Sequence, residues 1–268
     1  MAVDHAVDIR RTCTALALAL PLFAALYMGG WFLFAALMLI SAIGLWEFYS
    51  LFWPGCTRIC SRLLAIVLGW GMLYFTWIHR PQDALVFLGA GFVAAALNFL
   101  FRWDVLEEES FVPGSIFLAG LAYVPLLLLP ATYLGALKLS FIIVAVCASD
   151  IAAYFVGTRF GRHKLWPRVS PNKSSEGALG SLAGCLVVCG LFWLVCGQAP
   201  LWQFLLLGVL INAFAQLGDL FESALKRAVH VKDSSNLLPG HGGILDRADS
   251  VLFAMPVFAV VDQWFTFF

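Results

Sequence analysis

The segment Ser223–Asp249 contains most of the residues in this chain that can do chemistry. It sets lysine and arginine charges, two histidines and three aspartates among glycines. Lysine and arginine bind phosphate oxygens, and carboxylates are the donors that hard divalent cations prefer. The segment therefore predicts a site for phosphate and a metal ion.

Three aspartates are the candidate metal ligands. Asp246 and Asp249 stand three residues apart, so they share one face if the chain is helical there, and Asp219 is a candidate to join them. Magnesium is held by one or two carboxylates and completes its octahedron with water and substrate phosphates. We expect Mg²⁺ at these residues, and the presence of a second cation is left open.

The basic residues of the segment are suited to a phosphorylated substrate. Lys226 and Lys232 are mobile point charges, whereas Arg247 can grip two oxygens at once. No residue stands out as a covalent nucleophile. The pattern therefore favours direct phosphoryl or nucleotidyl transfer, in which positioning and charge neutralisation supply most of the catalysis.

Three glycines surround His241. Gly240, Gly242 and Gly243 permit positive φ and close approach of the backbone, so their amides can form an anion-binding nest. A plain turn is the alternative for the glycines taken alone. Together with the neighbouring charges they favour a phosphate-binding loop.

The rest of the chain is apolar and must supply the elements that position these groups. Hydrophobic residues make up 62% of the 268 positions and charged residues 12%, against roughly 45–50% and 25% in soluble domains. Continuous apolar runs, rather than alternating ones, predict an all-α polytopic integral membrane protein. Nine runs approach or exceed the length of a transmembrane helix: Thr12–Met28, Trp31–Leu51, Leu63–Trp77, Ala84–Phe101, Phe111–Leu129, Leu139–Val156, Ala178–Cys196, Leu201–Leu220 and Val251–Phe268.

The positive charges indicate how these nine helices are oriented. If they alternate from a cytoplasmic N-terminus, 14 of the 16 lysines and arginines fall on the cytoplasmic side, and only Arg80 and Lys138 on the other. Positive residues concentrate on the cytoplasmic side of membrane proteins. We therefore expect a cytoplasmic N-terminus and a C-terminus outside. The net charge of zero gives no basis for nucleic-acid binding.

The chain shows no repeat and no soluble domain, so residues 1–268 are expected to form a single membrane domain. Residues 1–137 supply N-terminal transmembrane helices. Residues 138–268 form the catalytic region, with cytoplasmic loops at 157–177 and 221–249.

The eighth apolar run carries a polar stripe that leads into the segment. Asn212, Gln216, Asp219, Ser223 and Lys226 are spaced by three or four residues, so they share one helical face. A hydrogen-bonded seam between helices is the alternative for the first two. An ionisable group at membrane depth is costly unless it is paired or bound to a cation, which favours a functional role for Asp219.

Two further acids lie in apolar runs. Asp150 meets the same argument as Asp219, with Tyr154 on its face. Glu47 stands among Trp46, Tyr49 and Trp53 and is interpreted as part of the interfacial aromatic belt.

Ser223–Asp249 resembles the signature of the phosphatidate cytidylyltransferases, also called CDP-diacylglycerol synthases. That signature reads S-x-hydrophobic-K-R-x4-K-D, then H-G-G-hydrophobic-x-D-R-x-D, and only Ala248 departs from it by being small. A second block, Asp150 to Gly157 with Ser170 to Gly177, resembles the other cytoplasmic loop of the family. Here Ser174 and Ser175 replace the usual threonine and aromatic residue.

The resemblance implies a reaction in which phosphatidate and CTP give CDP-diacylglycerol and pyrophosphate with magnesium, at the cytoplasmic face of a bacterial inner membrane. A homodimer is left open. The resemblance also implies catalytic roles for Lys226, His241, Asp246 and Asp249. It implies that Asp246 and Asp249, together with Asp219, bind the metal ion. The implied substrate-binding residues are Asp150, Tyr154, Ser170, Lys173, Ser174, Ser223, Arg227, Lys232, Asp233, Gly242, Gly243 and Arg247.

Two other functions compete with this one. A CTP-dependent lipid or polyprenol kinase would use similar residues but direct attack to the γ-phosphorus. An ion-coupled transporter would use Asp150 and Asp219 as ion sites, but inverted repeats and paired broken helices are not evident in the sequence.

Overall fold

The computed structural model describes residues 20–55, 57–106, 110–235, 237–238 and 242–268. The chain forms two compact units, each built from two stretches of sequence. Unit 1 comprises Met1–Tyr133 and Asp233–Leu245, and unit 2 comprises Leu134–Lys232 and Asp246–Phe268. The main boundary lies between Tyr133 and Leu134. The signature segment, however, is divided between the two units.

The protein is an all-α integral membrane protein. Seven helical stretches in the described part of the chain are long and apolar enough to cross a membrane, and they coincide with the second to eighth predicted runs. They are α2 (Gly30–Phe52), α3 (Ile59–Trp77), α4 (Pro81–Leu106), the stretch Val112–Thr132, α6 (Gly135–Phe160), α7 (Ser175–Cys196) and α8 (Leu201–Ala228).

The first and last predicted runs differ from these seven. About half of the first run, Thr12–Met28, lies outside the described residues. Its described part, residues 20–28, is helical. The last run becomes α9 (Leu245–Val261), which begins earlier than predicted and ends well before Phe268. Its 17 residues fall within the lower range of spanning lengths.

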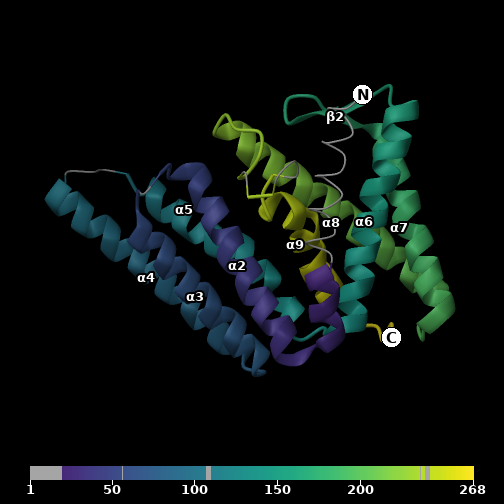
Figure 1. Ribbon diagram of the computed structural model, residues 1–268, viewed down its shortest axis with the longest axis horizontal. Helices are drawn as coiled ribbons and strands as arrows, with labels where there is room; N and C mark the ends of the chain where they lie inside the picture. Colours follow the sequence, from purple (N-terminus) through teal and green to yellow (C-terminus); the bar gives the residue numbers. More distant parts are fainter. Residues whose placement is uncertain (1–19, 56, 107–109, 236, 239–241) are drawn as a thin grey trace. The chain divides into compact units, whose positions relative to one another are not determined.

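In unit 1, α2, α3 and α4 lie side by side (Figure 1). Aromatic rings join α2 to α3, since Phe34 stacks on Trp77 with ring centroids 4.8 Å apart. The fifth stretch is divided into α5 (Val112–Leu121), a π-helical turn η1 (Ala122–Leu126) and a 3₁₀ turn η2 (Leu129–Thr132). Pro125 within the π turn lacks the N–H that a regular helix requires, which explains the local irregularity.

In unit 2, α6 and α7 pack closely along much of their length (Figure 1). Small residues of α7 make this possible. A Cβ built on Gly184 would lie 2.8 Å from the carbonyl oxygen of Ala148, and one on Gly180 would lie 2.6 Å from Val156. Close approach of this kind through small residues four apart is a common way to associate helices in a membrane.

Replacing Gly184 with isoleucine should therefore force α6 and α7 apart and destabilise the protein by about 1–3 kcal/mol. Gly190→Ile is the matched control, because a Cβ there meets no atom within 4 Å. Thermal unfolding in detergent measures both variants. Equal unfolding midpoints for the two would show that the close contact does not hold these helices together.

Phenylalanine rings bind the remaining helices of unit 2 to one another. Phe141 of α6 lies 6.3 Å from Phe204 of α8 and 5.8 Å from Phe258 of α9, measured between ring centroids. All three side chains are fully buried. This cluster holds the three helices that carry Asp150, Asp219 and Asp249.

The predicted loops are more ordered than expected. Residues within 157–177 form an antiparallel hairpin of β1 (Lys164–Trp166) and β2 (Ser170–Ser174), an exception to the all-α prediction. The predicted loop 221–249 is shorter than stated, because α8 continues to Ala228 and α9 begins at Leu245. Helical geometry therefore extends to Ser223, Lys226, Asp246 and Asp249.

Candidate active site

A cavity of ≈ 260 Å³ in unit 2 brings together five of the predicted site residues. α6 contributes Asp150 and Tyr154, β2 contributes Lys173 and Ser174, and α8 contributes Asp219. Both parts of the second sequence block therefore meet Asp219 of the polar stripe at one cavity. Its wall combines carboxylates, a lysine and hydroxyl groups, which suits a hydrated, charged ligand.

Asp219 is the most connected acid in this cavity. The ammonium of Lys173 forms an ion pair with its Oδ2. The Ser223 hydroxyl donates to its Oδ1 at 3.3 Å. The Asp219 side chain remains about one-third exposed, at 34%. It is thus held in place and still accessible to a ligand.

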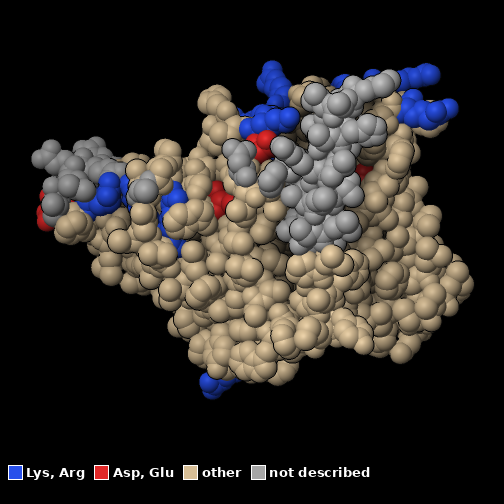
Figure 2. All heavy atoms as spheres, viewed as in Figure 1, with Lys and Arg blue, Asp and Glu red and all other residues tan. Residues whose placement is uncertain are grey.

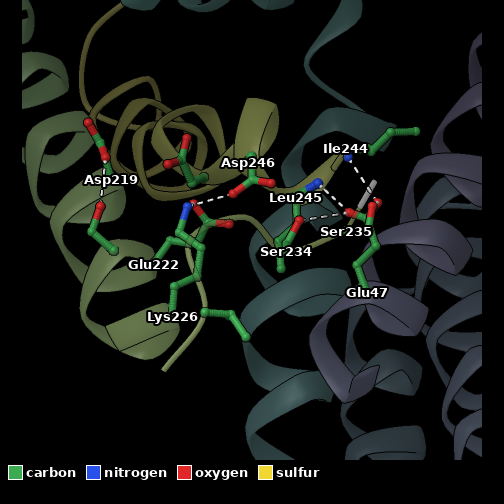
Figure 3. Close-up of polar contacts among 12 residues, drawn as sticks. Glu47, Asp219, Glu222, Lys226, Ser234, Ser235, Ile244, Leu245 and Asp246 are labelled. Atoms are coloured by element: carbon green, nitrogen blue, oxygen red, sulfur yellow. Dashed lines mark hydrogen bonds and ion pairs between the residues drawn. The ribbon is translucent and has the colours of Figure 1, made fainter. Parts of the chain in front are cut away.

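Lys226 lies between two carboxylates. Its Nζ is 2.8 Å from Oε2 of Glu222, one helical turn away, and 2.5 Å from Oδ1 of Asp246 on α9 (Figure 3). The Glu222 side chain has no exposed surface and that of Asp246 retains 6%. The ammonium is therefore fixed by contacts on two helices.

The three predicted metal ligands do not form a ready-made cage. Among the described residues, no group of three His, Cys, Asp or Glu side chains is arranged to hold a metal ion. Lysines lie against Asp219 and Asp246 instead. Asp249 is buried, and its Oδ1 accepts a hydrogen bond of 2.6 Å from the backbone N–H of Ser250.

The residue types nevertheless fit a divalent cation. Asp249 is buried, and the negative charge of the nearby Asp219 carboxylate repels its own. A cation held by these acids would oppose this effect, and carboxylate oxygens are what magnesium prefers. The repulsion between the two acids is the feature that a metal would relieve.

Ser174 and Glu176 order the hairpin that carries Lys173. Ser174 caps α7, since its hydroxyl accepts a hydrogen bond of 3.1 Å from the N–H of Gly177. The Glu176 carboxylate accepts a hydrogen bond of 3.1 Å from the backbone N–H of Arg162, and it lies 2.7 Å from Nδ1 of His163. The sequence interpretation gave Glu176 no role.

The first two residues of the polar stripe, Asn212 and Gln216, form hydrogen bonds between helices α7 and α8. The Ser181 hydroxyl of α7 donates to Oδ1 of Asn212 at 2.7 Å, and Nε2 of Gln216 donates to the carbonyl oxygen of Ala178 at 3.3 Å. This outcome is the alternative raised for these two residues. Asn212 is buried, whereas Gln216 also lines the cavity.

The glycines of the signature lie in unit 1. Gly242 has φ of 78°, as expected for a loop glycine, and its carbonyl oxygen accepts a hydrogen bond of 2.8 Å from the N–H of Leu238. Gly243 is buried. His241 and Gly240 lie outside the described residues, so their predicted roles stay predictions.

Several predicted substrate-binding residues are at the surface. Lys232, Asp233 and Arg247 are exposed, and Arg227 is exposed with a hydrogen bond of 3.2 Å from Nη1 to the carbonyl oxygen of Val231. Ser170 is half-buried and pairs with Trp166 in the hairpin. Over unit 2, lysine and arginine side chains gather at the end that carries β2 (Figures 1 and 2).

Glu47 and Glu222 are the acids that the sequence interpretation misjudged. Glu47 is not in an interfacial belt, because it is 3% exposed and hydrogen-bonded to the signature segment. The sequence prediction includes no role for Glu222, although the argument for Asp219, that an acid in an apolar helix is costly unless it is paired, applies to it equally. An acid in an apolar helix, four residues before a lysine, signals an ion pair.

Comparison with known families agrees with this geometry. The sequence model of the cytidylyltransferase family matches residues 9–265, nearly the whole chain. The chain belongs to the cytidylyltransferase family. Membership makes it a nucleotidyltransferase enzyme and explains why phosphate-binding charges and carboxylates gather among membrane helices.

Relatives of this cytidylyltransferase are named phosphatidate cytidylyltransferase. The protein of Staphylococcus haemolyticus is 34% identical over 265 residues, covering 94% of this chain and 97% of its own. The Brucella suis protein is 36% identical over 80% of this chain and 78% of its own. A Bacillus subtilis relative reaches 53% identity over 114 residues, 42% of each chain.

Proposed function

We propose that the protein transfers a cytidylyl group from CTP to phosphatidate and releases CDP-diacylglycerol and pyrophosphate. The observation that carries the proposal is the near full-length similarity to phosphatidate cytidylyltransferases. The cavity in unit 2 supports it, because its acids, lysine and hydroxyls suit a hydrated, phosphorylated ligand.

The transfer needs little proton chemistry from the protein. An oxygen of the lipid phosphate forms a bond to the α-phosphorus of CTP, the bond from that phosphorus to the bridging oxygen breaks, and pyrophosphate leaves with the electron pair. A phosphate monoester is already largely ionised near neutral pH, with a second pKa of about 6. A strong general base is therefore not required.

The lysines supply positive charge to the reacting phosphates. Lys226 is held by Glu222 and Asp246, and Lys173 by Asp219, so both ammoniums are positioned before substrate arrives. Charge that is already in place costs little reorganisation in the transition state. Arg247, Lys232 and His241 are proposed to add charge or hydrogen bonds to CTP or the lipid phosphate.

Asp219, Asp246 and Asp249 are proposed to hold magnesium. When bound, the cation would supply Lewis-acid stabilisation to phosphate oxygens. Asp150, Tyr154, Ser170, Ser174 and Ser223 are proposed to line the substrate-binding site.

The proposed topology has nine membrane spans with the N-terminus in the cytoplasm and the C-terminus outside. The 14-to-2 distribution of positive residues supports it, as does the gathering of lysine and arginine at one end of unit 2. The active site would then face the cytoplasm from a bacterial inner membrane, where CTP is available.

Labelled CTP tests the reaction directly. Purified protein in lipid nanodiscs with phosphatidate and Mg²⁺ is expected to make labelled lipid from α-labelled CTP and none from γ-labelled CTP. Detection of pyrophosphate, rather than CDP, completes the balance. Label entering lipid only from the γ-position would identify a lipid kinase and overturn the proposal.

A further inference from the structure

Glu47 is a buried acid with no place in the mechanism described above. It lies near the C-terminal end of α2, a helix of almost entirely apolar residues, and retains 3% of its exposed surface. A buried carboxylate is costly unless it is hydrogen-bonded. The partners of Glu47 therefore indicate why an acid is present at this position.

Those partners come from both arms of the signature loop, residues 234–245. On the first arm, the Ser234 and Ser235 hydroxyls donate to the carboxylate at 3.4 and 2.6 Å. On the second arm, the N–H groups of Ile244 and Leu245 donate at 3.1 and 2.7 Å (Figure 3). One side chain thus joins two chain segments that flank residues 236–243 in the sequence.

The N–H groups of Ile244 and Leu245 lie at the start of α9, where a helix offers no internal hydrogen-bond acceptor. Leu245 is the first residue of α9, and the first N–H groups of a helix have no partner within it. The positive end of the helix dipole also favours a carboxylate there. Glu47 therefore accepts a hydrogen bond from the N–H of Leu245, the first residue of α9, although the two residues are 198 positions apart in sequence.

Gly243 is shaped to this contact. A Cβ on Gly243 would lie 2.6 Å from both carboxylate oxygens of Glu47 and would also overlap the Ser234 hydroxyl. The missing side chain allows the carboxylate to enter the loop. Gly243 thus has a packing role, in addition to the phosphate-binding role predicted from sequence.

We propose that Glu47 is a positioning residue that holds the two described ends of the signature loop, residues 234–235 and 242–245, in the arrangement that binds the CTP phosphates. This inference rests on the proposed function, because the described part of the loop contains Gly242 and Gly243, which are predicted to bind phosphate. Glu47 is enclosed by loop residues, so it acts through them rather than on substrate. Its removal should weaken CTP binding without altering the use of the lipid.

Glu47→Gln is the decisive variant. Glutamine keeps the shape but replaces one acceptor oxygen with a donor. The N–H groups of Ile244 and Leu245 bind different oxygens of the carboxylate, so they cannot both keep their bonds. Since hydrogen bonds to a charged group are strong, we expect KM for CTP to rise about tenfold or more, with KM for phosphatidate unchanged. Ser235→Ala should show a smaller rise, and it tests the proposal even if Glu47→Gln folds poorly.

Tyr49→Phe is the matched control. Tyr49 lies on the same helix, and the variant loses its buried hydrogen bond of 2.7 Å to the Phe117 carbonyl oxygen. In the described part of the chain the Tyr49 ring contacts Phe48, Trp53 and Phe117. We expect a lower unfolding temperature with KM for CTP unchanged. A double variant, Glu47→Gln with Ser235→Ala, should resemble Glu47→Gln alone, because both changes act on the same carboxylate contact.

Hydrogen exchange without any substrate gives a readout independent of activity. Peptides covering residues 233–245 should exchange faster in Glu47→Gln than in the wild type or Tyr49→Phe. Unchanged exchange, or faster exchange with unchanged KM for CTP, would overturn the proposal. Failure of the proposed function is a separate result, since it would appear in the wild type as absence of α-label in lipid.

Discussion

Replacing Asp246 with asparagine is expected to abolish measurable formation of CDP-lipid, with a loss of about 10²–10³-fold or more in kcat. Asparagine keeps the shape of the side chain but removes its negative charge. The 2.5 Å ion pair to Lys226 is then lost. A proposed magnesium ligand is lost with it. Release of α-label from CTP into lipid, measured with saturating substrates in nanodiscs, gives kcat directly.

Asp262→Asn is the control for this experiment. Asp262 also pairs with a lysine, since Nζ of Lys138 lies 2.6 Å from its Oδ2, and it follows the C-terminal end of α9. It therefore loses a comparable ion pair without touching the cavity of unit 2. We expect a lower unfolding temperature and an unchanged kcat. A near wild-type kcat in Asp246→Asn would remove Asp246 from the mechanism.

The helices could be predicted from sequence because lipid imposes a simple rule. In a bilayer every backbone polar group must be paired internally, so a long apolar run has to be a helix. Seven runs follow this rule within the described residues. The hairpin of β1 and β2 escaped prediction, since its residues are polar and its pairing depends on a local turn. α9 was placed too late because its first turn is polar.

The site was predictable where it depends on helical spacing. The stripe from Asn212 to Lys226 lies on one continuous helix, and Asp219 reaches the cavity. Sequence periodicity cannot show contacts between distant segments. Glu47 meets residues 187–198 positions away, so its aromatic neighbours in sequence were a misleading guide. Glu222 was within reach of the same rule that identified Asp219.

Among the single variants proposed for this protein, Lys226→Met is expected to lower the free energy of unfolding the most. Methionine leaves the fully buried Glu222 and the nearly buried Asp246 without their shared partner. Removing one member of a buried ion pair costs about 3–5 kcal/mol, because an uncompensated charge remains. The unfolding midpoint in detergent should fall accordingly. CDP-lipid synthesis should also be lost, because no ammonium remains at this position to neutralise phosphate.

A second change separates the structural role of Lys226 from its chemical role. Adding Glu222→Gln to Lys226→Met removes one of the two stranded charges, that of the fully buried Glu222. Replacing a buried ion pair with neutral groups of similar volume is often close to neutral in stability. The double variant should therefore regain much of the lost unfolding temperature while CDP-lipid synthesis stays absent. Activity that returns together with stability would mean that Lys226 serves only to balance the buried acids. Stability without activity would place its ammonium in the phosphate-binding machinery.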